Sequence, residues 1–237
     1  MRYQLALEKN LRVVSLTPNN IALVEAFITY DSDYSRSGDK NAAPDNNFHG
    51  STAFWMNELR KHLTSTKEHC SYIYQEVVSN AVSAVDRENS THINADGVGR
   101  AELTSRLLQL TKKEFMDLLK NPKADYKLIN ILSAKTHPTR ANAYARVNYS
   151  FATKFCHYAC MGLFEGLDEQ DNFSIFDNVV AKAIPLYTTM YKIPFSKNDL
   201  FDYPKYVKLI DEIIKKSKSE ISRNGFDHLL WYYYKAR

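Results

Sequence analysis

The sequence contains little glycine, proline or cysteine. Of its 237 residues, 7 are glycine, 7 are proline and 3 are cysteine. So few chain-breaking residues disfavour a loop-rich β-sandwich and favour long helices. The three cysteines, Cys70, Cys156 and Cys160, do not form the even set of a disulfide framework. They indicate a reducing compartment, so we expect a cytoplasmic protein.

Long apolar runs are also missing. No stretch approaches the roughly 18 uninterrupted apolar residues of a membrane span, and the first residues do not have the pattern of a signal peptide. We therefore expect no membrane association. The formal net charge is +4 and the isoelectric point about 8.8, which is compatible with a polyanionic partner without requiring one.

Aromatic residues are abundant, and most segments have the periodicity of a helix. The chain has 16 tyrosines, 12 phenylalanines and 2 tryptophans. Apolar residues recur at helical spacing in most segments, for example from residue 67 to 85. The sequence predicts an all-α protein with seven or more helices, while alternation in the first 17 residues is compatible with a small strand. We expect a single compact monomer, or two lobes of about 18–137 and 138–237 with return contacts.

Lys154 is a basic residue in the small and apolar stretch "FATKFCHYAC". The predicted helix begins near Phe151, which places Lys154 in its first turn. The positive end of the helix dipole and the apolar surroundings both lower the pKa of a lysine. A neutral amine can attack carbon and form a Schiff base. The alternative is a lysine that extends its amine to solvent along an apolar surface.

Asp177 lies in "FSIFDNVV", at the predicted start of the following helix. An ionised carboxylate in a cleft can stabilise a developing cation or orient a nucleophile. Aspartate is also a favoured N-cap residue, and this structural role is the alternative.

Taken together, the two segments resemble the helix-hairpin-helix DNA glycosylases, and among them the 8-oxoguanine branch. In that superfamily a hairpin ends in a lysine that opens a small, apolar helix, and a short apolar run then delivers the aspartate. The resemblance covers roughly residues 146 to 187. The segment "NYSFATK" lacks the two glycines usual before the lysine, and the gap to the aspartate is a few residues longer.

The resemblance implies a fold and a function. The fold would be helical, with a cleft between two lobes. The protein would remove a modified base from duplex DNA, and a Schiff base on Lys154 would add AP lyase activity, with Asp177 as the catalytic carboxylate. No cofactor is expected beyond a monovalent cation at the hairpin. The hairpin residues that would contact DNA are Asn148, Ser150, Phe151 and Thr153.

Aromatic residues supply candidates for the base pocket. Four consecutive aromatics, Trp231 to Tyr234, lie near the end of the sequence and cannot all point into a core from one helix. They form either an amphipathic edge or a stacking wall for an extruded base. The base-pocket candidates are Phe155, His157, Phe176, Trp231 and Tyr232.

Three other patterns point elsewhere. "RNGFDH" matches the Arg-x4-His pattern of HEPN ribonucleases, so a ribonuclease with Arg223 and His228 is the rival enzyme. A nucleic-acid-binding module without catalysis is the rival outside enzymes. Cys156, His157 and Cys160 lack a fourth ligand at diagnostic spacing, so we expect no metal site. Four lysines in "KLIDEIIKKSKSE" are solvated surface or contacts to phosphates: Lys208, Lys215, Lys216 and Lys218.

Overall fold

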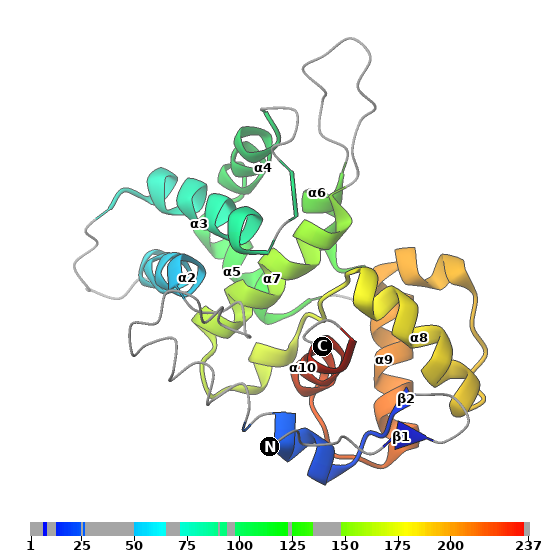
Figure 1. The fold of residues 1–237 in the computed structure, drawn as a ribbon. Coiled ribbons are helices and arrows are strands. Elements are labelled where there is room, and N and C mark those ends of the chain that lie inside the picture. Colours follow the sequence, from blue (N-terminus) through cyan, green and yellow to red (C-terminus); the bar gives the residue numbers. More distant parts are fainter. Residues whose placement is uncertain are drawn as a thin grey trace. The chain divides into compact units, whose positions relative to one another are not determined.

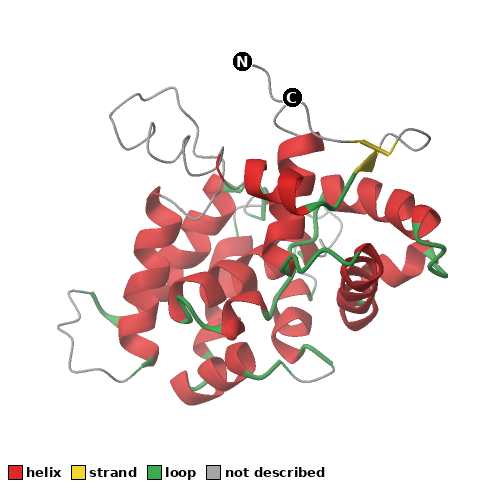
Figure 2. Cartoon of the chain, turned by 90° about the horizontal axis from the view of Figure 1, so that it is seen from below, coloured by secondary structure: helices red, strands yellow, loops and turns green. Residues whose placement is uncertain are grey.

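The protein is all-α. A computed structural model describes residues 7–8, 13–24, 26, 50–64, 72–89, 91–93, 98–122, 125–134 and 148–234. Helices make up most of these residues, as Figure 2 shows, and the predicted fold class is confirmed. The alternating N-terminal segment forms two short antiparallel strands, β1 (Leu7–Glu8) and β2 (Val13–Val14).

The chain divides into two compact units. The middle unit is Asn47–Phe173, and the terminal unit joins Met1–Asn46 to Ser174–Arg237. The sequence suggested lobes that divide near residue 137, whereas the division falls after Phe173. In the terminal unit the hydroxyl of Tyr187 donates to the backbone oxygen of Val14 at 2.7 Å, which ties the N-terminal segment to the C-terminal helices.

The middle unit is built around α7 (Tyr149–Leu163). Helices α2 (Gly50–Leu63), α3 (Tyr74–Glu88), α5 (Lys112–Lys120) and α6 (Lys127–Ser133) all contact it, as Figure 1 shows. Helix α4 (Gly99–Leu108) packs on α3 and α6, and the short 3-10 helix η1 (Asp168–Asp171) follows α7. Twelve of the 15 residues of α7 are buried. An apolar sequence with so little polar surface is what a central helix requires.

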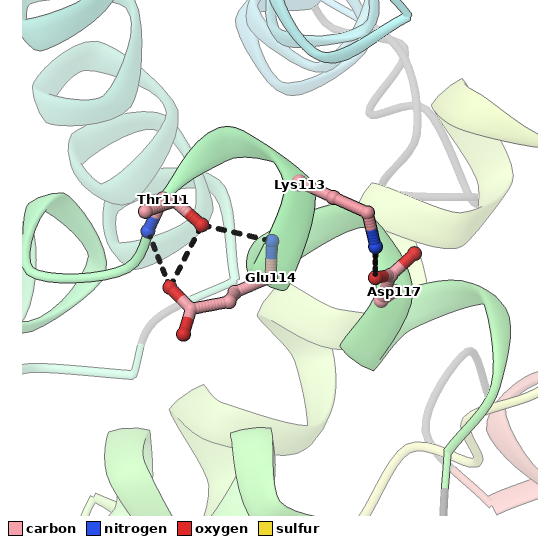
Figure 3. Close-up of polar contacts among 4 residues, drawn as sticks. All are labelled: Thr111, Lys113, Glu114 and Asp117. Atoms are coloured by element: carbon pink, nitrogen blue, oxygen red, sulfur yellow. Dashed lines mark hydrogen bonds and ion pairs between the residues drawn. The ribbon is translucent and has the colours of Figure 1, made fainter.

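A local sequence signal explains where α5 begins. Thr111 and Glu114 form a capping box at the start of α5, in which the Thr111 hydroxyl accepts from the Glu114 backbone N–H and the Glu114 carboxylate accepts from that of Thr111 (Figure 3). One turn further, Lys113 and Asp117 form an exposed ion pair at 2.5 Å. The box satisfies backbone donors that the helix leaves without partners.

Asp86 fixes the loop that follows α3. Asp86 is 4% exposed, and its carboxylate accepts from the Thr91 hydroxyl, the Ile93 backbone N–H and Arg100 Nε at 2.7, 2.9 and 2.8 Å. Burial raises the pKa of Asp86, but these hydrogen bonds and the charge of Arg100 outweigh it and hold the pKa below its ordinary value. The ionised carboxylate therefore stabilises this loop.

The terminal unit combines the two strands with a helical layer. Residues 18–24 are helical, and α8 (Asn178–Met190), η2 (Lys197–Phe201), α9 (Tyr203–Ser217) and α10 (Arg223–Tyr234) follow. Strand β2 contacts both α8 and α10. Pro185 lies inside α8, and the hydroxyls of Thr188 and Thr189 donate to its backbone oxygen.

Candidate functional site

Lys154 is the sixth residue of α7 and so lies in its second turn, not in the first turn that the sequence predicted, and it is 6% exposed. Its Nζ donates to the backbone oxygen of Asn89 at 3.3 Å. Asn89 is the C-cap residue of α3, 65 residues away in the sequence. The amine is thus directed to a carbonyl inside the middle unit. A lysine is seldom buried to this extent without a structural or chemical reason.

Asn89 also binds Tyr158, one turn after Lys154 on α7. The Tyr158 hydroxyl donates to Asn89 Oδ1 at 2.8 Å, so two residues of α7 hold the end of α3. Both Asn89 and Tyr158 are buried. Sequence reasoning missed this pair. The spacing of four residues between Lys154 and Tyr158 is a local signal that they share a helix face, but no local signal points to Asn89.

Asp177 is the N-cap residue of α8 in the terminal unit. Its Oδ1 accepts from the backbone N–H groups of Val179 and Val180 at 2.8 and 3.0 Å. Within the described residues, Oδ2 forms no hydrogen bond. The side chain is half-buried. One oxygen therefore anchors the helix, which is the structural role anticipated for this residue, and the second oxygen is left for another contact.

The two candidate catalytic residues belong to different units. Lys154 is in the middle unit, and Asp177 follows the last residue of that unit, Phe173, after three residues outside any helix or strand. Their approach across a cleft to within about 10 Å, the reach that cooperating groups around a bound sugar require, stays a prediction.

The predicted hairpin residues surround the start of α7. Asn148 occupies the N-cap position without a capping hydrogen bond from its side chain, and it is 3% exposed. Among the described residues, neither Asn148 Oδ1 nor Nδ2 has a partner. Thr153 is buried and donates to the backbone oxygen of Ser150 at 3.1 Å. The sequence of residues 139–147 also predicts a helix before the hairpin, and these residues lie outside the described part of the chain.

The aromatic candidates on α7 lie in the core of the middle unit. Phe155 is fully buried, and its ring stacks on those of Phe151 and Phe115 with centroid distances of 5.7 and 6.4 Å. His157 is 3% exposed, and its Nδ1 lies 2.9 Å from the backbone oxygen of Phe173. Because a carbonyl only accepts, Nδ1 carries the hydrogen in this bond. These side chains contribute packing.

The aromatic candidates of the terminal unit are more varied. Phe176 is 8% exposed and makes edge contacts with Phe201 and Tyr206. Trp231 and Tyr232 are half-buried on α10, whereas Leu230 and Tyr233 are buried. The helix therefore buries one side and leaves Trp231 and Tyr232 partly accessible to a ligand.

The ribonuclease pattern and the cysteines have other surroundings. Arg223 binds Asp211 through two hydrogen bonds, Nε to Oδ1 at 2.6 Å and Nη2 to Oδ2 at 2.8 Å, and His228 is half-buried. Burial raises the pKa of the Cys156 and Cys160 thiols well above the ordinary value, so both stay protonated. In the described ranges, no group of three or more His, Cys, Asp or Glu side chains could hold a metal ion.

Comparisons with known proteins leave the family open. No protein-family model, curated protein or solved structure matches this chain. In the parts that the structure describes, no helix is both long and apolar enough to span a membrane. The function of this chain is therefore inferred from its own residues.

Proposed function

We propose that this chain is a DNA glycosylase that releases a modified base and then cleaves the strand through a Schiff base on Lys154. The observation that carries the proposal is the buried amine of Lys154 in the second turn of the central helix, bound to the Asn89 carbonyl. The resemblance of the segment from Lys154 to Asp177 to helix-hairpin-helix glycosylases supplies the reaction class.

Lys154 is the proposed nucleophile. Burial disfavours the charged form of an amine, and the uncharged form carries the lone pair that attacks carbon. Attack of Nζ on the sugar C1′ forms the C–N bond while the N-glycosidic bond breaks, and the base leaves with the bonding electrons and takes a proton. Opening of the sugar ring gives the Schiff base. Loss of a C2′ proton then expels the 3′ phosphate.

Asp177 is the proposed electrostatic partner. Positive charge develops on the sugar as the base departs, and a fixed carboxylate nearby stabilises it. Because Oδ1 is held by the Val179 and Val180 amides, the carboxylate has a fixed orientation. Oδ2, which makes no hydrogen bond in the described structure, is the oxygen that would face the sugar.

Two further features support a nucleic-acid substrate. The buried side chain of Asn148 has polar atoms without partners in the described structure, and such groups cost about 1–3 kcal/mol each. Function is a common reason for keeping them. Trp231 and Tyr232 are partly accessible, and aromatic rings of this kind stack on extruded bases.

The test is single-turnover base release on a panel of duplexes that each carry one modified base. Wild type should release at least one of them. Lys154→Gln should abolish strand scission. The matched control is Lys120→Gln, which changes an exposed lysine of the same unit and should leave the rate unchanged. Full strand scission by Lys154→Gln would refute the proposed nucleophile, and failure of wild type on every duplex would refute the function.

The ribonuclease alternative has no observation in its favour. It requires Arg223 to act at a reaction centre, but the Nε–Nη2 edge of its guanidinium binds both carboxylate oxygens of Asp211. If the protein cleaved RNA and His228→Ala abolished that cleavage, the ribonuclease would replace the glycosylase as the preferred function.

A further inference from the structure

A depression of about 620 Å³ runs along the exposed face of α9 in the terminal unit. The described residues that line it are Lys208, Asp211, Glu212, Lys215, Lys216 and Lys218. Positions 208, 211, 212, 215 and 216 recur at three- and four-residue spacing, so they form one stripe of the helix. Four of the six lining residues carry positive charge.

The four lysines of this face outnumber its two acids, Asp211 and Glu212, so its positive charge is only partly offset. Within the described residues, none of its four lysines forms an ion pair. Asp211, one of the two acids, is compensated by the two hydrogen bonds from Arg223. Lys205, at the other end of α9, pairs instead with Asp199 and Asp202. The lysines that line the depression are therefore available to bind an anionic ligand.

The opposite face of α9 fixes this surface in place. Tyr206, Val207, Ile210 and Ile213 are buried against the rest of the unit. At its end, the Ser217 hydroxyl donates to the backbone oxygen of Ile214 and shares a hydrogen bond with the Ser219 hydroxyl. Lys218 follows in the left-handed conformation, with φ 57°. The lysines thus project from a helix with an anchored face and a hydrogen-bonded end.

We propose that this basic face of α9 holds the sugar-phosphate backbone of duplex DNA. From position 208 to 218 a helical rise of 1.5 Å per residue gives about 15 Å. One strand of duplex DNA places a phosphate every 3.4 Å along its axis, so about four base pairs match this length. Lysine binds phosphate as a point charge, and such contacts do not read the base sequence. They can therefore hold duplexes of many different sequences.

The inference rests on the proposed function, because it names the surface that holds the substrate of that reaction. Its test is nevertheless a binding measurement, and it needs no base release. The probe is an unmodified 20-base-pair duplex, titrated by fluorescence anisotropy between 50 and 200 mM KCl.

The test variant replaces Lys208, Lys215 and Lys216 by glutamine. The matched control replaces Lys182, Lys192 and Lys205, three exposed lysines elsewhere in the same unit, so both variants lose the same charge. The slope of log K against log salt is negative, and each lost phosphate contact reduces its magnitude by about 0.9. We expect a slope smaller by about 2.7 in the test variant. Between 50 and 200 mM KCl, the factor by which salt weakens DNA binding should then be about 40-fold smaller for the test variant than for wild type. The control slope should equal that of wild type.

The outcomes separate this inference from the proposed function. A test variant with the wild-type slope, or a control that loses as much slope, would overturn the inference even when base release is intact. A lost slope in the test variant alone supports it, even when no duplex of the panel releases a base. Preference for duplex RNA, removed by the same three substitutions, would overturn the assignment to DNA.

Discussion

Asp177 and Asp202 are both N-cap aspartates of the terminal unit, and only Asp177 has a proposed role in chemistry. Asp177 begins α8 and Asp202 begins α9. Both side chains are half-buried. Asn in place of either one keeps a capping oxygen. The pair of variants Asp177→Asn and Asp202→Asn therefore separates catalysis from helix capping.

The expected effect on stability is small and similar for both. In Asp177→Asn the amide oxygen can still accept from the Val179 and Val180 amides, and the new NH₂ group replaces Oδ2, which has no hydrogen bond to lose within the described residues. What is lost is the charge at the helix N-terminus, about 0.3–1 kcal/mol. For a chain of this size that corresponds to a fall in melting temperature of roughly 1–4 °C.

The expected effect on activity differs greatly. A carboxylate about 4 Å from a developing sugar cation, at an effective dielectric constant of about 20, contributes about 4 kcal/mol. Each 1.36 kcal/mol is a factor of ten in rate, so the loss would approach 10³. Removal of one preorganised electrostatic group typically costs 10² to 10³. Asp177→Asn should slow base release by this factor, and Asp202→Asn should not.

The assay is single-turnover base release at saturating enzyme, with a melting curve for each variant. A normal rate for Asp177→Asn would refute the electrostatic role. Equal loss of rate in both variants would show that capping of these helices, and not the charge of Asp177, limits the reaction.

Three further predictions concern the middle unit. In Gly162→Ala the new Cβ would lie 2.8 Å from Met56 Cβ, so we expect the free energy of unfolding to fall by about 1–3 kcal/mol in a urea titration. An unchanged midpoint would show that the close approach of α2 and α7 is absent. Tyr158→Phe leaves Asn89 Oδ1 without its donor, so the free energy of unfolding should fall by about 1–3 kcal/mol in the same assay. An unchanged free energy would exclude the buried hydrogen bond. Because the pKa of Asp86 is lowered in the folded state, its contribution is present above the ordinary value of 3.8 and is lost as the pH falls through the lower folded value. The difference in melting temperature between wild type and Asp86→Asn should therefore narrow below pH 3.8, and a gap that widens there would contradict this sign.

The sequence predicted the parts of the fold that depend on local pattern. The apolar face of α3 and the starts of α7 and α8 follow from helical spacing and from the residues at the helix ends. The division into units could not be predicted, because it depends on contacts between distant segments. The bond from Tyr187 to Val14 spans 173 residues, and no local periodicity records it.

The candidate site shows the same limit. Lys154 and Asp177 stood out because their charge contrasts with apolar neighbours. The structure places Asp177 at the N-cap of α8, as the pattern indicated, but Lys154 in the second turn of α7, because that helix begins at Tyr149 and not near Phe151. The carbonyl that accepts from Lys154 belongs to Asn89, 65 residues earlier, in a polar loop that resembles any surface loop. The exposed lysines of α9 were visible in the sequence, whereas the neutralisation of Asp211 by Arg223 required the packing of α9 and α10.

Trapping of the covalent intermediate tests the central claim most directly. Wild-type protein is incubated with a duplex that it cleaves, in the presence of borohydride, and the adduct is digested and mapped by mass spectrometry. Borohydride reduces a Schiff base to a stable amine, so we predict one adduct, on Lys154, which Lys154→Gln does not form. Base release without any adduct, or an adduct on another residue, would contradict the assignment of Lys154 as the nucleophile.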